Sequence, residues 1–233
     1  MFHDLYIFFK WNYKSILEGF KLKRIIILVC VLALALPCVH GYAETEIRVV
    51  SFGHYEQDNN TDNGPEPIEW IILTQMGNHA LLLSRNCLDA QYFNSKYGSA
   101  PWETCSLRNW LNDTFLNTAF TEEEQNLIFE TSCSNALMDG YPGFKADGGK
   151  TTKDKIYLLS YKELLQFADG ITIPDATEYA ASKSDSASTW WLRSPGPDNH
   201  AALVLHSSGE LNYYPSDLNR MGVRPVISMK LEN

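Results

Sequence analysis

The chain has 233 residues, of which 45% are hydrophobic, and a formal net charge of −9. This acidic balance excludes the basic face that a nucleic-acid binder needs to neutralise phosphates, and it equally opposes docking on anionic lipid. The length behind an N-terminal leader suits one domain with a sizeable core.

The first 43 residues have the features of a secretion signal. Three basic residues between positions 21 and 24 precede the apolar run 25–39, and a small-x-small sequence at 41–43 precedes Glu44. The run is shorter than the roughly 20 residues of a spanning helix, which favours cleavage, although an uncleaved signal anchor stays open. We therefore expect a secreted or cell-surface protein. Its domain, residues 44–233, keeps 14 of the 19 basic and 26 of the 28 acidic residues, a net charge of −12.

The first part of this domain predicts three strands. Residues 48–52 form a short strand that ends in a polar loop at 53–67. Residues 68–74 and 79–84 are two apolar runs joined across a Gly-Asn turn, which is a hairpin signal. Both runs are apolar on either face, so we expect them in the middle of the fold.

Helices follow. Apolar residues recur at i, i+3 and i+4 in the segment 106–112, as Leu107, Trp110 and Leu111. Thr121 with Glu124 is a capping box that begins another helix. After a loop at 139–155 and a short strand at 156–159, Ser160 with Glu163 is a second capping box, for a helix through residue 168.

The pattern after residue 189 is β throughout. We expect a strand at 190–194, a hairpin of 201–206 with 210–214 across Ser207-Ser208-Gly209, and a last strand at 223–231. Helices in the middle of the sequence with strands at both ends predict an α+β fold and not repeated βαβ units.

Five motifs, in order, resemble the domain of unknown function 6273 family, an exported bacterial domain. They are Pro-Ile-Glu-Trp at 67–70, Trp-Glu-Thr-Cys-Ser-Leu-Arg-Asn-Trp-Leu-Asn at 102–112, Lys-Ile-Tyr-Leu-Leu-Ser at 155–160, Trp-Leu-Arg-Ser at 191–194 and Val-Arg-Pro at 223–225. The resemblance covers residues 47–231 and lends no catalytic residue. The strand-rich ending is also similar to the C-type-lectin-like fold of sulfatase-modifying-type proteins and bacterial surface modules. That similarity implies small twisted antiparallel sheets, two or three helices in the middle of the chain, and long loops that form the ligand site.

The segment 190–195 carries the main candidate site. Because side chains alternate along a strand, Trp191 and Arg193 share one face, opposite Trp190 and Leu192. An aromatic ring beside a guanidinium suits the binding of a sugar or a peptide side chain. The remaining candidate residues lie on the following loop and hairpin: Asp198, Asn199, His200, Tyr213 and Tyr214. The alternative is that both tryptophans belong to the core and that Arg193 pairs with a buried acid.

Two further features are read as structural. Glu69 interrupts an apolar strand, and we expect it to form a buried ion pair with Arg224. The Asp-x-Asn-x-Asp run at 58–62, with Glu69 twelfth in the count, superficially matches a calcium loop. Asn63 stands where that loop needs glycine, so we expect no metal or cofactor, while weak calcium binding stays open.

Enzyme signatures are missing from the sequence. It has no Gly-x-Ser-x-Gly elbow, no His-Glu-x-x-His and no phosphate loop, and no cysteine follows Cys133. The three cysteines of the domain, Cys87, Cys105 and Cys133, allow at most one disulfide, with three pairings open. The leading interpretation is a non-enzymatic binding module for carbohydrate or a protein surface. One alternative is an enzyme acting on glycan or cell-wall material through carboxylates such as Asp198 and Glu210, and another is a structural envelope domain.

Overall fold

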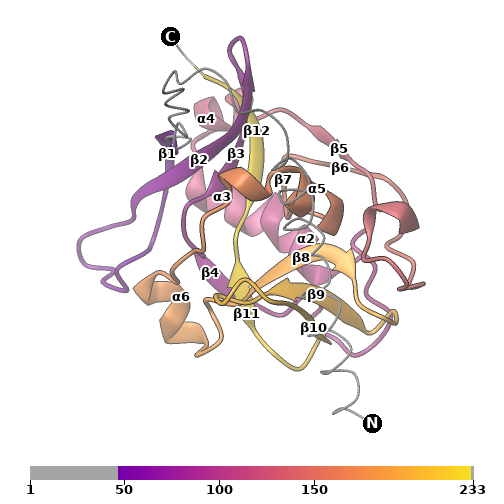
Figure 1. Cartoon of the computed structure of the whole chain (residues 1–233). Coiled ribbons are helices and arrows are strands. Elements are labelled where there is room, and N and C mark those ends of the chain that lie inside the picture. Colours follow the sequence, from indigo (N-terminus) through magenta and orange to yellow (C-terminus); the bar gives the residue numbers. More distant parts are fainter. Residues whose placement is uncertain (1–46, 232–233) are drawn as a thin grey trace, which may run out of the picture. The chain divides into compact units, whose positions relative to one another are not determined.

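The structure, a computed structural model, describes residues 47–231 (Figure 1). The expected signal segment, residues 1–43, lies outside the described residues. The fold is α+β, with mostly strands, short helices and several small sheets. Among residues 47–231, no helix combines the length and hydropathy needed to cross a membrane.

The first sheet is antiparallel and contains the predicted N-terminal hairpin. Its order is β1 (Val49–Tyr55), β2 (Glu66–Met76), β3 (His79–Ser84), β12 (Val226–Lys230) and β7 (Ile156–Tyr157). The β2–β3 turn includes Gly77 at φ 62°, a left-handed conformation that glycine adopts without strain. Both hairpin strands lie inside the sheet, as their two-sided apolar pattern predicts.

The second sheet is built mostly from the C-terminal part of the chain. Its order is β10 (Leu211–Pro215), β9 (Ala201–Leu205), β8 (Trp190–Pro195), β11 (Met221–Val223) and β4 (Asp89–Gln91). The pair β8–β11 is parallel and the other pairs are antiparallel. The predicted hairpin of β9 with β10 is confirmed, with Gly209 at φ 80° in its turn.

The expectation of one last strand at 223–231 is wrong. The chain leaves the second sheet after Val223, passes through Arg224 and Pro225, and enters the first sheet as β12. Arg224 is fully buried at this corner and donates to the carbonyls of Ser84, Arg85 and Thr172 at 2.8–3.2 Å. These bonds hold the corner between β11, which belongs to the second sheet, and β12, which belongs to the first.

The helices lie between the strands in sequence, and both capping boxes are confirmed. A helical segment runs through α2 (Ser106–Trp110), a π-helical turn (Leu111–Phe115) and α3 (Leu116–Ala119), and α4 (Glu122–Leu127) follows. Thr121 caps α4, and Ser160 caps α5 (Tyr161–Gln166). The last helix is α6 (Glu178–Lys183), and the small ladder of β5 (Thr131–Cys133) with β6 (Thr152–Asp154) completes the fold.

One hydrophobic core connects the two five-stranded sheets. Its largest fully buried side chains are aromatic: Trp70, Trp102, Trp190, Trp191, Phe93 and Phe115. Asp154 is buried on β6, where it pairs with Arg108 at 2.6 Å and accepts from Trp102 Nε1 and Thr152 Oγ1. This network fixes the β5–β6 ladder against α2, and the ladder in turn supports the loop that follows β5.

Candidate functional site

Trp191 is a core residue. Its side chain is fully buried, its ring meets Phe93 edge-on at 5.5 Å between centroids, and its Nε1 donates to the Gln91 carbonyl at 2.8 Å. Trp190 is buried on the opposite side of β8, under the guanidinium of Arg224. The expected exposed aromatic face of β8 is therefore wrong, because packed residues cover this strand on both sides.

Arg193 pairs with an acid, as the core alternative predicts, although that acid, Glu163, is partly exposed and not buried. It is 3% exposed and forms a two-point contact with the carboxylate of Glu163, with Nη2 to Oε1 at 2.8 Å. Its Nη1 also donates to the Leu158 carbonyl at 2.7 Å, and its Nη2 to the Ser134 carbonyl at 3.3 Å. Burial acts to lower the pKa of Arg193, but the hydrogen bond and charge of Glu163 outweigh it and raise that pKa.

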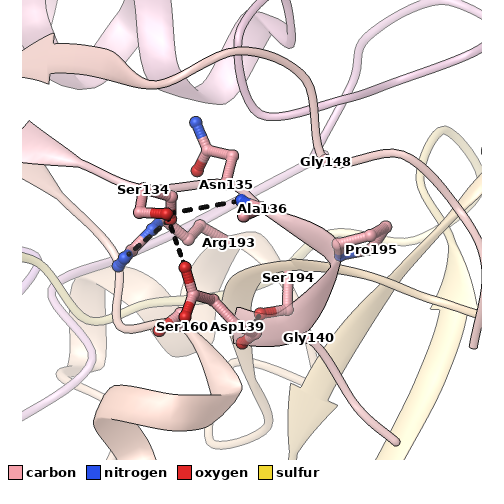
Figure 2. A pocket seen from close by; sticks show the side chains of 10 residues that line it. All are labelled: Ser134, Asn135, Ala136, Asp139, Gly140, Gly148, Ser160, Arg193, Ser194 and Pro195. Carbon is pink, nitrogen blue, oxygen red and sulfur yellow. Dashed lines mark hydrogen bonds between the residues drawn. The ribbon is translucent and has the colours of Figure 1, made fainter. Parts of the chain in front are cut away.

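Arg193 nevertheless lines a pocket. The pocket has an empty volume of about 190 Å³ that includes solvent at its mouth, and its enclosed part has room for about one water molecule. Its walls come from the loop after β5, from Gly148, from the α5 cap and from the end of β8 (Figure 2). The lining residues are Ser134, Asn135, Ala136, Asp139, Gly140, Gly148, Ser160, Arg193, Ser194 and Pro195.

The charges around this pocket are paired. Asp139 accepts from Ser134 Oγ at Oδ2 and from Lys162 Nζ at Oδ1, the latter at 2.8 Å. Burial acts to raise the pKa of Asp139, but these two hydrogen bonds and the charges of Lys162 and Arg193 lower it overall. The pocket wall thus contains one carboxylate, Asp139, and one cation, Arg193, and their ionic partners Lys162 and Glu163 are not lining residues.

A second, more aromatic pocket adjoins the first. It shares Asn135, Ala136, Gly140, Gly148 and Pro195, and it adds Leu137, Tyr141, Phe144 and Ala146. Its empty volume is about 210 Å³. We call the two pockets together the 134–148 cleft. Gly148 is required at its floor, because a Cβ there would lie 2.6 Å from the Asn135 carbonyl oxygen.

One of the predicted site residues lines this cleft, and two others contact residues at it. Arg193 lines the polar pocket, and Tyr213 packs edge-on against Phe144 at 5.8 Å. Asn199 Oδ1 accepts from the Asp147 amide at 3.1 Å, which ties the β8–β9 loop to the segment beside Gly148.

The other predicted residues lie elsewhere. Asp198 and His200 are exposed on the β8–β9 loop, where the His200 ring stacks on Tyr97 at 5.3 Å. Tyr214 points from β10 toward His206, with 6.0 Å between ring centroids. The cleft residues that sequence reasoning missed belong to the loop at 134–148, where Tyr141 and Phe144 in a polar, Gly-rich segment were the available signal.

The expected Glu69–Arg224 pair is not formed. Glu69 points outward from β2 and pairs with Arg85 at 2.8 Å, with both side chains about half exposed. Arg224 instead uses backbone carbonyls at the corner between the sheets, and burial lowers its pKa to about 10. A strand glutamate facing solvent needs no buried partner, which removes the reason for the predicted pair.

The acidic loop has a different arrangement from a calcium loop. Carboxylate oxygens of Glu56, Asp58 and Glu66 lie within 4.8 Å of one another, whereas Glu69 pairs with Arg85. These carboxylates accept backbone hydrogen bonds within the loop: Asn60 N donates to Glu56 and Asp58 at 2.9 Å, and Gln57 N donates to Glu66 at 2.7 Å. Turn formation accounts for the cluster, which therefore assigns no metal.

The three cysteines of the described residues are buried free thiols: Cys87, Cys105 and Cys133. Burial raises the pKa of each to about 12. Each thiol is therefore protonated at neutral pH and is part of the core.

A comparison with curated proteins and a comparison with solved structures each find no match to this chain. A protein-family model does match it, over residues 77–231. The matched region begins at the β2–β3 turn and contains all the residues of the 134–148 cleft. The chain therefore belongs to the family described as Domain of unknown function (DUF6273).

Proposed function

We propose that this protein is a non-enzymatic binding domain, secreted or displayed at the cell surface, that holds carbohydrate in the 134–148 cleft. One observation carries the proposal: a polar pocket and an aromatic pocket adjoin and share five lining residues. Sites for small ligands are concave, with apolar walls and a few converging polar groups. A sugar has the matching chemistry, because its ring presents an apolar face and its hydroxyls point outward.

The aromatic wall supports a ring-stacking role. Phe144 is half-buried and touches both Tyr141, at 4.9 Å between centroids, and Tyr213, at 5.8 Å. Tyr141 in turn meets Tyr161 of α5 at 5.2 Å. Two rings, Tyr141 and Phe144, therefore line the pocket, and the rings of Tyr161 and Tyr213 pack against them. Such rings give contact area at a small entropic cost.

The C-type-lectin-like assignment belongs to the same proposal. Supporting it are the short helices between the N-terminal hairpin and the C-terminal sheet, and the long 134–151 loop beside the end of β8. Such a scaffold places ligand residues on loops above a small sheet. The fold alone does not specify a ligand, so the cleft residues carry the functional argument.

The enzyme alternative finds less support in the geometry. Asp198 and Glu210 lie at opposite ends of β9, since Glu210 pairs with His206 across the hairpin. Five strand steps separate these ends by about 17 Å, beyond the roughly 10 Å limit for paired glycosidase carboxylates. Inside the cleft, Asp139 is held by Lys162 with a lowered pKa, which makes it a poor general acid.

The test is calorimetric titration of the protein with a panel of neutral and acidic oligosaccharides. We expect Phe144→Ala to weaken binding at least tenfold, because it removes the central ring of the wall. Tyr97→Ala is the matched control, since Tyr97 is 82% exposed beside His200 and outside the cleft. Absence of binding to the whole panel would overturn the proposal. Loss of binding in Tyr97→Ala but not in Phe144→Ala would move the site to the 198–200 loop and refute the cleft.

A further inference from the structure

Two buried polar atoms, each on a residue that lines the polar pocket, lack a hydrogen-bond partner among residues 47–231. They are Asn135 Oδ1 and Arg193 Nε. Asn135 is 7% exposed and Arg193 is 3% exposed, so neither atom is in bulk solvent. A buried donor or acceptor without a hydrogen-bond partner destabilises the fold, because it loses its bonds to water and gains none in return. Two such atoms on residues of one pocket can form hydrogen bonds with a polar group of a ligand.

The neighbouring hydrogen bonds fix what each atom offers. Asn135 Nδ2 donates to the Lys150 carbonyl at 2.7 Å, which orients the amide and leaves Oδ1 as an acceptor. The two Nη atoms of Arg193 are committed to Glu163, Leu158 and Ser134, which leaves Nε–H as a donor. Figure 2 shows the Asn135 amide with its oxygen on the side of Ser134, against which the arginine also lies. The pocket thus offers one acceptor and one donor.

The surrounding charges select a neutral group. An anion placed there would meet the carboxylate of Asp139, and a cation would meet the guanidinium of Arg193. Both of these groups already have ionic partners that do not line the pocket, Lys162 and Glu163. A hydroxyl both donates and accepts, and it requires no counter-charge. The enclosed space, large enough for about one water molecule, fits a single hydroxyl.

Resting on the proposed function, we infer that the polar end of the 134–148 cleft is a subsite for one hydroxyl of a neutral sugar. That hydroxyl donates to Asn135 Oδ1 and accepts from Arg193 Nε–H, while the sugar ring lies toward Phe144. The subsite selects neutral hexoses over hexuronic acids, and it discriminates at one ring position.

The experiment compares methyl glucoside, galactoside and mannoside with their mono-deoxy analogues and with the corresponding hexuronic acids, by ligand-observed NMR titration. We expect removal of one particular hydroxyl to weaken binding to the wild type about tenfold, the effect of losing a paired hydrogen bond. Asn135→Leu has a similar volume without the acceptor, and it should bind the parent and that deoxy sugar equally. Asn109→Leu, at an exposed position of α2, is the matched control and should keep the wild-type discrimination.

The outcomes separate the two proposals. Binding that depends on Phe144 but is insensitive to every deoxygenation, or to Asn135→Leu, overturns the subsite and leaves the proposed function standing. Preference for hexuronic acids overturns the neutral selectivity. Absence of binding to every sugar, with water alone at the pocket, overturns both. The deoxy series on the wild-type protein decides the matter even if Asn135→Leu does not fold.

Discussion

Replacing Glu163 with alanine should expose how much the Arg193 pair contributes to stability. Glu163 holds the Arg193 guanidinium and also accepts the Ser160 amide at 2.9 Å as part of the α5 capping box. Removing one partner of a buried pair costs about 3–5 kcal/mol. The Glu163 side chain is 27% exposed, so we lower this to about 2–4 kcal/mol. Loss of the cap adds about 1 kcal/mol.

A matched control exists on α4. Glu124 occupies the same capping-box position, accepts the Thr121 amide at 2.8 Å and is partly buried, with no cation paired to it in the described part of the chain. We expect Glu124→Ala to lower the free energy of unfolding by about 1 kcal/mol, the cap alone. The measurement is urea unfolding followed by tryptophan fluorescence and far-ultraviolet circular dichroism. Equal losses in Glu163→Ala and Glu124→Ala would refute the reasoning, because the buried arginine would then tolerate losing its acid.

Three more predictions follow from the burial and charge of single positions. Iodoacetamide at pH 8 should leave the three buried cysteines unmodified in the native protein and alkylate them after unfolding. Peptide mapping that finds these cysteines alkylated in the native protein would contradict their burial. Because the folded-state pKa of Asp139 is lowered, its contribution to stability is present above about pH 4 and is lost as pH falls through that lowered pKa. Asp139→Asn should therefore flatten the acid limb of stability against pH, and an unchanged limb would exclude this role. Gly222→Ala would place a Cβ 2.1 Å from the Ala187 carbonyl oxygen and should lower the free energy of unfolding in urea by about 3 kcal/mol or more. Gly170→Ala, with open space around the added Cβ, should leave that free energy nearly unchanged. Similar losses in both variants would contradict the close packing at Gly222.

Local signals in the sequence predicted local structure well. The capping boxes at Thr121 and Ser160 and the hairpin turn at Gly209 depend on residues a few positions apart, and the structure confirms them. The α+β class followed from the order of such segments. The finer C-type-lectin-like assignment remains a proposal.

The features that could not be predicted from the sequence, the cover of β8 and the walls of the cleft, depend on long-range packing. The alternation of side chains placed Trp191 and Arg193 on one face of the strand. The residues that cover this face are distant in sequence: Phe93 lies 98 positions from Trp191, and Glu163 lies 30 positions from Arg193. The cap at Ser160 was predicted, yet its glutamate gave no sign that it would also hold an arginine. Likewise, the local signal of Tyr141 and Phe144 in a polar segment did not show that the loop at 134–148 forms a cleft, because its position against the end of β8 depends on tertiary contacts.

The corner at Arg224 has a consequence for how the protein is made. β11 lies between β8 and β4, and β12 lies between β3 and β7, so each sheet lacks an inner strand until residues 221–230 have left the ribosome. The nascent chain must then keep two incomplete sheets with exposed edges, a state open to mispairing with other chains. Both sheets of the native topology can therefore close only after the segment with β11 and β12 has been made.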